Sequence, residues 1–171
     1  WCSASSKLTS RTTAVAVTAD VQVACDDPGI PPAAKFQAWV AETVGQSGRA
    51  PAGDTEVAVR VVGADEMQTL NRLYRDKDSA TNVLSFPAGD MEGLPPGAPR
   101  LLGDVVVCAT VVAAEAGEQG KALADHWAHM IVHGTLQLLG FDHETDAEAA
   151  EMEALEARIL ATQSVIDPYA G

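Results

Sequence analysis

The sequence lacks an apolar run long enough to cross a membrane. The longest run, residues 105–114, falls well short of the roughly 20 residues that span a bilayer. The start, Trp1-Cys2-Ser3, has neither an initiator Met nor the apolar core of a secretion signal. We therefore expect no membrane-spanning segment, and a chain that is trimmed, tagged or mis-started at this end.

Cysteine is scarce, and its spacing forms no metal or disulfide motif. Cys2, Cys25 and Cys108 are odd in number, far apart and without a C-x-x-C pair. This usage is typical of a reducing compartment, so a cytoplasmic location is predicted. Cys108 ends an apolar run and is expected to be a small core residue.

Positive charge is also in short supply. The chain has 11 Lys and Arg against 24 Asp and Glu, a net charge of −13, which excludes a broadly basic nucleic-acid binder. After Lys121 the only basic residue is Arg158, against nine acids, and we expect this acidic segment to form a solvated face. A polyanion would have to bind locally, at the cations gathered in the middle of the sequence. These are Arg60, Arg72, Arg75 and Lys77.

What is present is the pattern of one globular domain. Residues 1–13 are rich in Ser and Thr and are predicted to lie outside the fold, with a single domain over 14–171. Strands are predicted at 14–24, 55–62, 81–86 and 101–108. Helices are predicted from Pro31-Pro32 to Gly45, at 64–74, at 110–139 with a break near 117–120, and at 144–161. The fold class is therefore α+β, a small mixed four-stranded sheet with flanking helices.

One connection is long enough to suggest a function of its own. Residues 87–100 hold four prolines and three glycines, so a loop is predicted there.

The informative segment is a helix that carries three of the four histidines in the chain. Steps of three and four residues place His126, His129, His133 and Gln137 along one helix face. The first two are expected to be structural, and His129 could support a ligand through a hydrogen bond or cap a helix.

The fourth histidine follows the predicted end of this helix. Gly140 is placed to end the helix in a left-handed conformation, and His143 lies three residues beyond it. Three extended residues span about 10 Å. Along the helix, His133 lies about 10 Å and His129 about 16 Å from Gly140. His143 can therefore meet side chains at the level of Gln137 and His133, but not easily His129.

The spacing resembles the zinc-binding helix H-E-x-x-H-x-x-G-x-x-H of metzincin proteases. Gly134 stands where those enzymes have the general base, and Gln137 where they have the second His. A protease built this way would lack a carboxylate to take the proton from water, so this zincin-like metal helix favours a function other than proteolysis.

Four blocks follow one another along the chain, at residues 70–78, 81–87, 102–104 and 133–143. Together they resemble the YbeY family, bacterial metal-dependent endoribonucleases that mature ribosomal RNA. The family signature H-G-x-L-H-L-x-G-[YF]-D-H matches residues 133–143 at every specified position except Gln137, where the family has His. Beyond the blocks 70–78, 81–87 and 102–104, the likeness extends through 115–121, 126–129 and 148–160 to about 167–169.

The resemblance implies a site and a set of partners. The metal ligands, for one zinc ion, would be His133, Gln137 and His143, and Arg75 would be a functional arginine that binds phosphate. The partners would be single-stranded RNA, ribosomal RNA and the small ribosomal subunit with its proteins. A neutral amide is a poorer zinc ligand than imidazole, so Gln137 is either a natural variant or a deliberate substitution.

Two alternatives to an endoribonuclease follow from the same residues. A weakened metal site favours a non-catalytic ribosome-assembly factor, which would bind its partners without cleaving RNA. A metalloprotease is the less favoured alternative because its base is absent.

Overall fold

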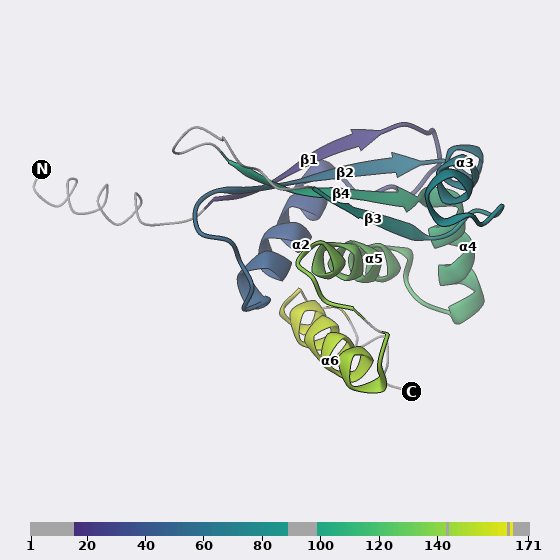
Figure 1. Ribbon diagram of the computed structural model, residues 1–171. Helices are drawn as coiled ribbons and strands as arrows, with labels where there is room; N and C mark the ends of the chain where they lie inside the picture. Colours follow the sequence, from purple (N-terminus) through teal and green to yellow (C-terminus); the bar gives the residue numbers. More distant parts are fainter. Residues whose placement is uncertain (1–15, 89–98, 143, 164, 166–171) are drawn as a thin grey trace, which may run out of the picture.

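The computed structural model describes residues 16–88, 99–142, 144–163 and 165. Four strands form one sheet in the order β1-β2-β4-β3 (Figure 1). They are β1 (Val17–Val23), β2 (Thr55–Val62), β3 (Val83–Pro87) and β4 (Arg100–Cys108). β1, β2 and β4 run parallel and β3 pairs antiparallel with β4, so the predicted mixed sheet is confirmed. The predicted extension 1–13 and most of the loop 87–100 lie outside the described residues.

Helices cover the two faces of the sheet unequally. α2 and α5 lie against one face, and α6 packs on the side of α5 that faces away from the sheet (Figure 1). α3 packs on the opposite face, where Met67 and Leu70 join Leu84 and Val106. The helices are α2 (Ala33–Gln46), α3 (Ala64–Arg75), α4 (Ala109–Gln119), α5 (Leu123–Leu138) and α6 (Asp146–Thr162). None of these helices is both long and apolar enough to span a bilayer.

The main core lies between the sheet and α2 and α5. Alternate residues of β2 point into it, and Val57, Val59 and Val61 are at most 1% exposed. Phe36 of α2 meets Trp127 of α5 edge to face, with ring centroids 5.7 Å apart. Burial on this scale fixes α5, the helix that carries the histidines, against the sheet.

A glycine allows α5 to approach β3 closely. A Cβ atom at Gly134 would lie 2.7 Å from Val105 Cγ1 and 3.3 Å from Ser85 Oγ. The Ser85 hydroxyl lies 3.0 Å from the carbonyl oxygen of Gly134 and can donate to it. Position 134, read from the sequence as the place of a missing catalytic base, is therefore a packing contact.

We expect Gly134→Ala to lower the free energy of unfolding by about 1–3 kcal/mol, because the added methyl group forces α5 away from Val105. Urea unfolding followed by circular dichroism measures the change. Gly117→Ala in α4 is the matched control, since a Cβ there meets nothing within 4 Å. It should raise stability by up to about 1 kcal/mol, through helix propensity alone. Equal stabilities of wild type and Gly134→Ala would contradict the close approach.

The end of α5 has the geometry expected from the sequence. Gly140 has a φ of 94°, and its N–H donates to the carbonyl of Gln137 over 3.1 Å. The next N–H, from Phe141, donates to Leu136 over 3.1 Å, which completes a Schellman motif. The Arg49 guanidinium stacks 3.8 Å from the centroid of the Phe141 ring. The chain thus leaves the helix in a fixed direction toward Asp142. His143 itself lies outside the described residues.

Candidate active site

A cleft of about 210 Å³ lies where the ends of α3, β3 and α5 come together. It is lined by Arg75, Ser85, Pro87, Gln137, Phe141 and Asp142. Arg75 and Gln137, both predicted site residues, therefore share one cleft although they come from different helices. The third described candidate, His133, lies one turn back from Gln137 on α5.

Ser85 holds the carboxamide of Gln137 in place. The Ser85 Oγ lies 2.9 Å from Gln137 Oε1 and 3.0 Å from the Gly134 carbonyl oxygen, and the hydroxyl has only one hydrogen for these two acceptors. The hydroxyl donates to Gln137 Oε1 or to the Gly134 carbonyl at any one time, and Oε1 keeps a second lone pair that can face an ion.

The ring of His133 is held by a carboxylate on α6. His133 Nδ1 lies 3.0 Å from Glu156 Oε2, and the side chain of His133 is 22% exposed. A carboxylate only accepts hydrogen bonds, so Nδ1 carries the hydrogen of this contact. Imidazole binds metals in its neutral form, through the ring nitrogen that carries no hydrogen, and in the Nδ1–H tautomer that nitrogen is Nε2.

The same carboxylate also binds His129. His129 Nε2 lies 3.2 Å from Glu156 Oε1, and the residue is 9% exposed. The structural role expected for His129 fits this buried position behind His133.

The sequence interpretation of Glu156 was wrong. Glu156 was counted with the solvated acidic face, yet it is 0% exposed. A local signal does exist, because Glu156 stands on the buried stripe of α6 with Met152, Leu155, Ile159 and Leu160. A carboxylate at such a position requires partners inside the protein, and two of its partners among the described residues are histidines.

A second carboxylate–histidine pair lies at the other end of α5. His126 Nε2 lies 2.9 Å from Glu115 Oε1, and the Asn82 amide donates to the same oxygen over 3.1 Å. Burial lowers the pKa of His126, and the hydrogen bond and charge of Glu115 oppose that shift only in part. None of these residues lines the cleft, so the structural role expected for His126 fits as well.

Arg75 ends α3 with its guanidinium available. The helix stops at Asp76, which has a left-handed φ of 57°, and Arg75 is exposed. Its neighbour Arg72 pairs with Asp78 over 3.8 Å, whereas Arg75 makes no ion pair with any residue that the structure describes. This position at the cleft is compatible with the predicted role of Arg75 in phosphate binding.

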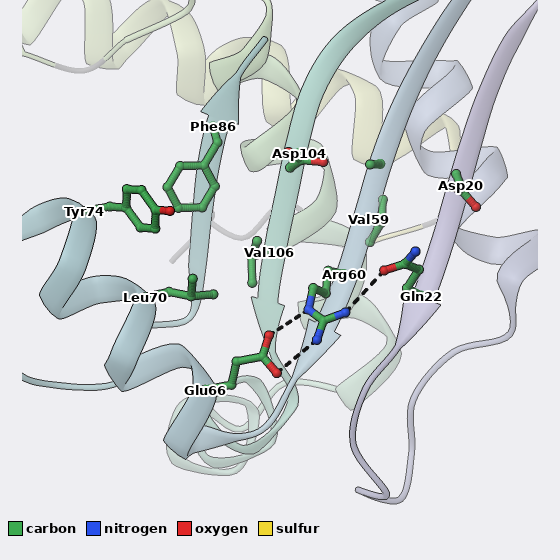
Figure 2. A pocket seen from close by; sticks show the side chains of 11 residues that line it. Asp20, Gln22, Val59, Arg60, Glu66, Leu70, Tyr74, Phe86, Asp104 and Val106 are labelled. Atoms are coloured by element: carbon green, nitrogen blue, oxygen red, sulfur yellow. Dashed lines mark hydrogen bonds and ion pairs between the residues drawn. The ribbon is translucent and has the colours of Figure 1, made fainter.

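Arg60 does not belong to this group, although the sequence places it near Arg75. It lies on the face of the sheet that α3 covers, where its guanidinium donates to both oxygens of Glu66 over 2.7 and 3.1 Å. A second pocket of about 470 Å³ lies there. Figure 2 shows its lining, with Asp20 on β1 and Asp104 on β4 on either side of β2, and no histidine is among the described residues that line it. The expected cluster of four cations is therefore wrong with respect to Arg60.

The described donors fit a metal ion in part. His133 Nε2 and the Gln137 amide oxygen are atom types that divalent metals accept, and they belong to residues one helical turn apart. No group of three His, Cys, Asp or Glu side chains within the described ranges is placed to hold an ion. The expected third ligand, His143, is outside those ranges.

The chain matches known proteins over most of its length. The sequence model of a family described as "Endoribonuclease YbeY" matches residues 23–164. A protein of that name from Stenotrophomonas maltophilia (strain R551-3) is 58% identical over 144 residues, which are 84% of this chain and 87% of the relative. Another from Halorhodospira halophila is 55% identical over 139 residues, 81% of this chain and 88% of the relative.

A solved structure has a similar fold. The solution structure of TM1509 from Thermotoga maritima matches with a TM-score of 0.51 and 21% sequence identity. The match covers 88% of this chain and 99% of that one. At this identity the likeness concerns the fold alone, which agrees with the α+β class.

Proposed function

The chain belongs to the endoribonuclease YbeY family, and we propose that it is a metal-dependent endoribonuclease that cleaves single-stranded RNA in ribosomal RNA maturation. The observation that carries this proposal is the cleft that Arg75 and Gln137 share. His133 lies one helical turn from Gln137 on α5 and is not among the described residues that line the cleft. The proposed location is the cytoplasm, and the proposed partners are ribosomal RNA and the small ribosomal subunit with its proteins.

In the proposed site, His133, Gln137 and His143 hold one ion, with zinc as the expected metal. When bound, the ion supplies Lewis acidity toward the phosphate or toward a water molecule. Glu156 keeps the lone pair of His133 on Nε2, and Ser85 keeps the carboxamide of Gln137 in place. The chain's own residues thus set the direction of two of the three donors.

Arg75 acts on the phosphodiester itself. Its planar guanidinium offers several N–H donors, and it binds the non-bridging oxygens on which negative charge increases during cleavage. Because the protein carries a net charge of −13, this cation matters for holding a polyanion as well as for the reaction.

The test is incubation of zinc-loaded protein with end-labelled single-stranded RNA, with a duplex of the same sequence, and with casein. We expect internal cleavage of the single strand, little cleavage of the duplex, loss of activity with a chelator and recovery after zinc is added back. His133→Ala should be inactive under all conditions. RNA binding without cleavage would favour the non-catalytic assembly factor, and cleavage of casein would favour the protease.

A further inference from the structure

Glu156 connects two helices through two imidazole rings. It comes from α6, and its two oxygens lie 3.0 Å from His133 Nδ1 and 3.2 Å from His129 Nε2, both on α5. The residue is 0% exposed, so bulk solvent does not reach its oxygens. Each ring therefore contacts one oxygen of a buried carboxylate.

This arrangement fixes a different tautomer for each ring. Since a carboxylate accepts only, His133 carries its hydrogen on Nδ1, whereas His129 carries its hydrogen on Nε2. In the opposite tautomer of His133, the hydrogen would be on Nε2, the nitrogen proposed to face the ion. Nδ1 and the Glu156 carboxylate would then both be acceptors, and no hydrogen bond could form between them. Only the first tautomer makes His133 a metal ligand through Nε2.

His129 has a part in the same arrangement. A buried carboxylate needs hydrogen-bond donors for both of its oxygens, and one ring can supply only one N–H here. His129 supplies the second from a position one turn before His133. The carboxylate is therefore held at a fixed place and angle, and the ring plane of His133 is fixed with it.

We propose that Glu156, supported by His129, is the positioning residue of the metal site, because it holds His133 in the Nδ1–H tautomer with Nε2 directed to the ion. The inference rests on the proposed metal-dependent function. A hydrogen bond of this kind raises the metal affinity of a histidine ligand, and its loss typically weakens affinity by about 10- to 100-fold.

The test starts with the full chain without metal. Long-range ¹H–¹⁵N spectra at pH 8 distinguish the two tautomers of each assigned histidine. We expect His133 to be in the Nδ1–H form in the wild type and to shift toward the Nε2–H form in Glu156→Met, which has a similar size but no acceptor. Zinc affinity, measured by competition with a chelator, should fall by roughly 10- to 100-fold in the same variant.

Glu115→Met is the matched control, because Glu115 forms the equivalent pair with His126 away from the cleft. It should change the His126 signals and leave both the His133 tautomer and the zinc Kd unchanged. Should Glu156→Met fail to fold, Glu156→Gln keeps the shape of the side chain with one acceptor and one donor. Because only the amide oxygen accepts a hydrogen bond, at most one of the two rings then keeps its wild-type tautomer. Zinc affinity should fall in proportion to the fraction of His133 that changes to the Nε2–H tautomer.

Two results would overturn the inference. One is a wild-type His133 in the Nε2–H form. The other is a Glu156 variant in which the zinc Kd and the His133 tautomer change independently of each other. A wild-type protein that binds no zinc would instead contradict the proposed function, and the tautomer measurement would still show whether Glu156 sets the state of the ring.

Discussion

Alanine in place of Arg75 should lower the rate of RNA cleavage by roughly a hundredfold or more, since one donor aimed at developing charge commonly contributes that much. Arg75 is exposed at the end of α3 and lines the cleft, so the fold and the metal content should not change. Single-turnover cleavage of labelled RNA at saturating zinc measures the rate, and elemental analysis measures the zinc.

Two further variants test whether the rate depends on where the positive charge lies and on the geometry of its donors, or only on the number of positive charges. Arg72→Ala removes a cation from the same helix that pairs with Asp78 and does not line the cleft, so cleavage should fall little. Arg75→Lys keeps the charge but lacks the planar fork of donors, and should restore only part of the rate. Equal losses in Arg72→Ala and Arg75→Ala would mean that Arg75 contributes only general electrostatic attraction for RNA.

Gln137→His should raise metal affinity by a few kcal/mol, which corresponds to roughly a hundredfold in Kd. The change replaces a neutral amide oxygen by the imidazole nitrogen that zinc prefers, one turn from His133. Ser85 Oγ, now 2.9 Å from the Gln137 amide, is placed to accept a ring N–H and so to orient the new ligand. Chelator competition gives the Kd, and an RNase assay at saturating metal shows whether the rate rises as well.

Gln137→Ala provides the lower limit for this position. If the amide oxygen contributes to the site, affinity should fall in the order His, Gln, Ala. The same affinity in the Gln and His proteins would show that position 137 does not reach the ion, and the ligand set taken from the family resemblance would be incorrect.

The elements could be predicted because their signals are local. Gly120 and Gly140 both adopt positive φ, and they end α4 and α5 where the sequence indicated a break and a stop. The alternation of β-branched residues in 55–62 gave the bounds of β2 without error. In each case the physical cause lies within a few residues of its effect.

The site could be predicted only where a motif linked distant segments. Nothing local to Arg75 indicates that it shares a cleft with Gln137, and the family resemblance alone suggested it. Arg60 shows the opposite case, because proximity in sequence suggested a cluster with Arg75. Arg60 instead pairs with Glu66 and lines the pocket beside α3, whereas Arg75 lines the cleft at the C-terminal end of α3. Glu156 was missed because its partners lie on another helix, and a count of charges cannot distinguish a buried carboxylate from a solvated one.

The contacts of Glu156 on α6 with His129 and His133 on α5 link metal binding thermodynamically to the docking of α6. An ion that binds only while Glu156 holds His133 stabilises the docked state, by about 2.7 kcal/mol at a free concentration of 100 times Kd. The coupling is reciprocal, so a substitution that populates the undocked state of α6 weakens metal binding in proportion to the docked fraction that is lost, even if it touches no ligand. In the metal-free protein, backbone amides of α6 should therefore exchange with solvent faster than those of α2, and the ion should slow them.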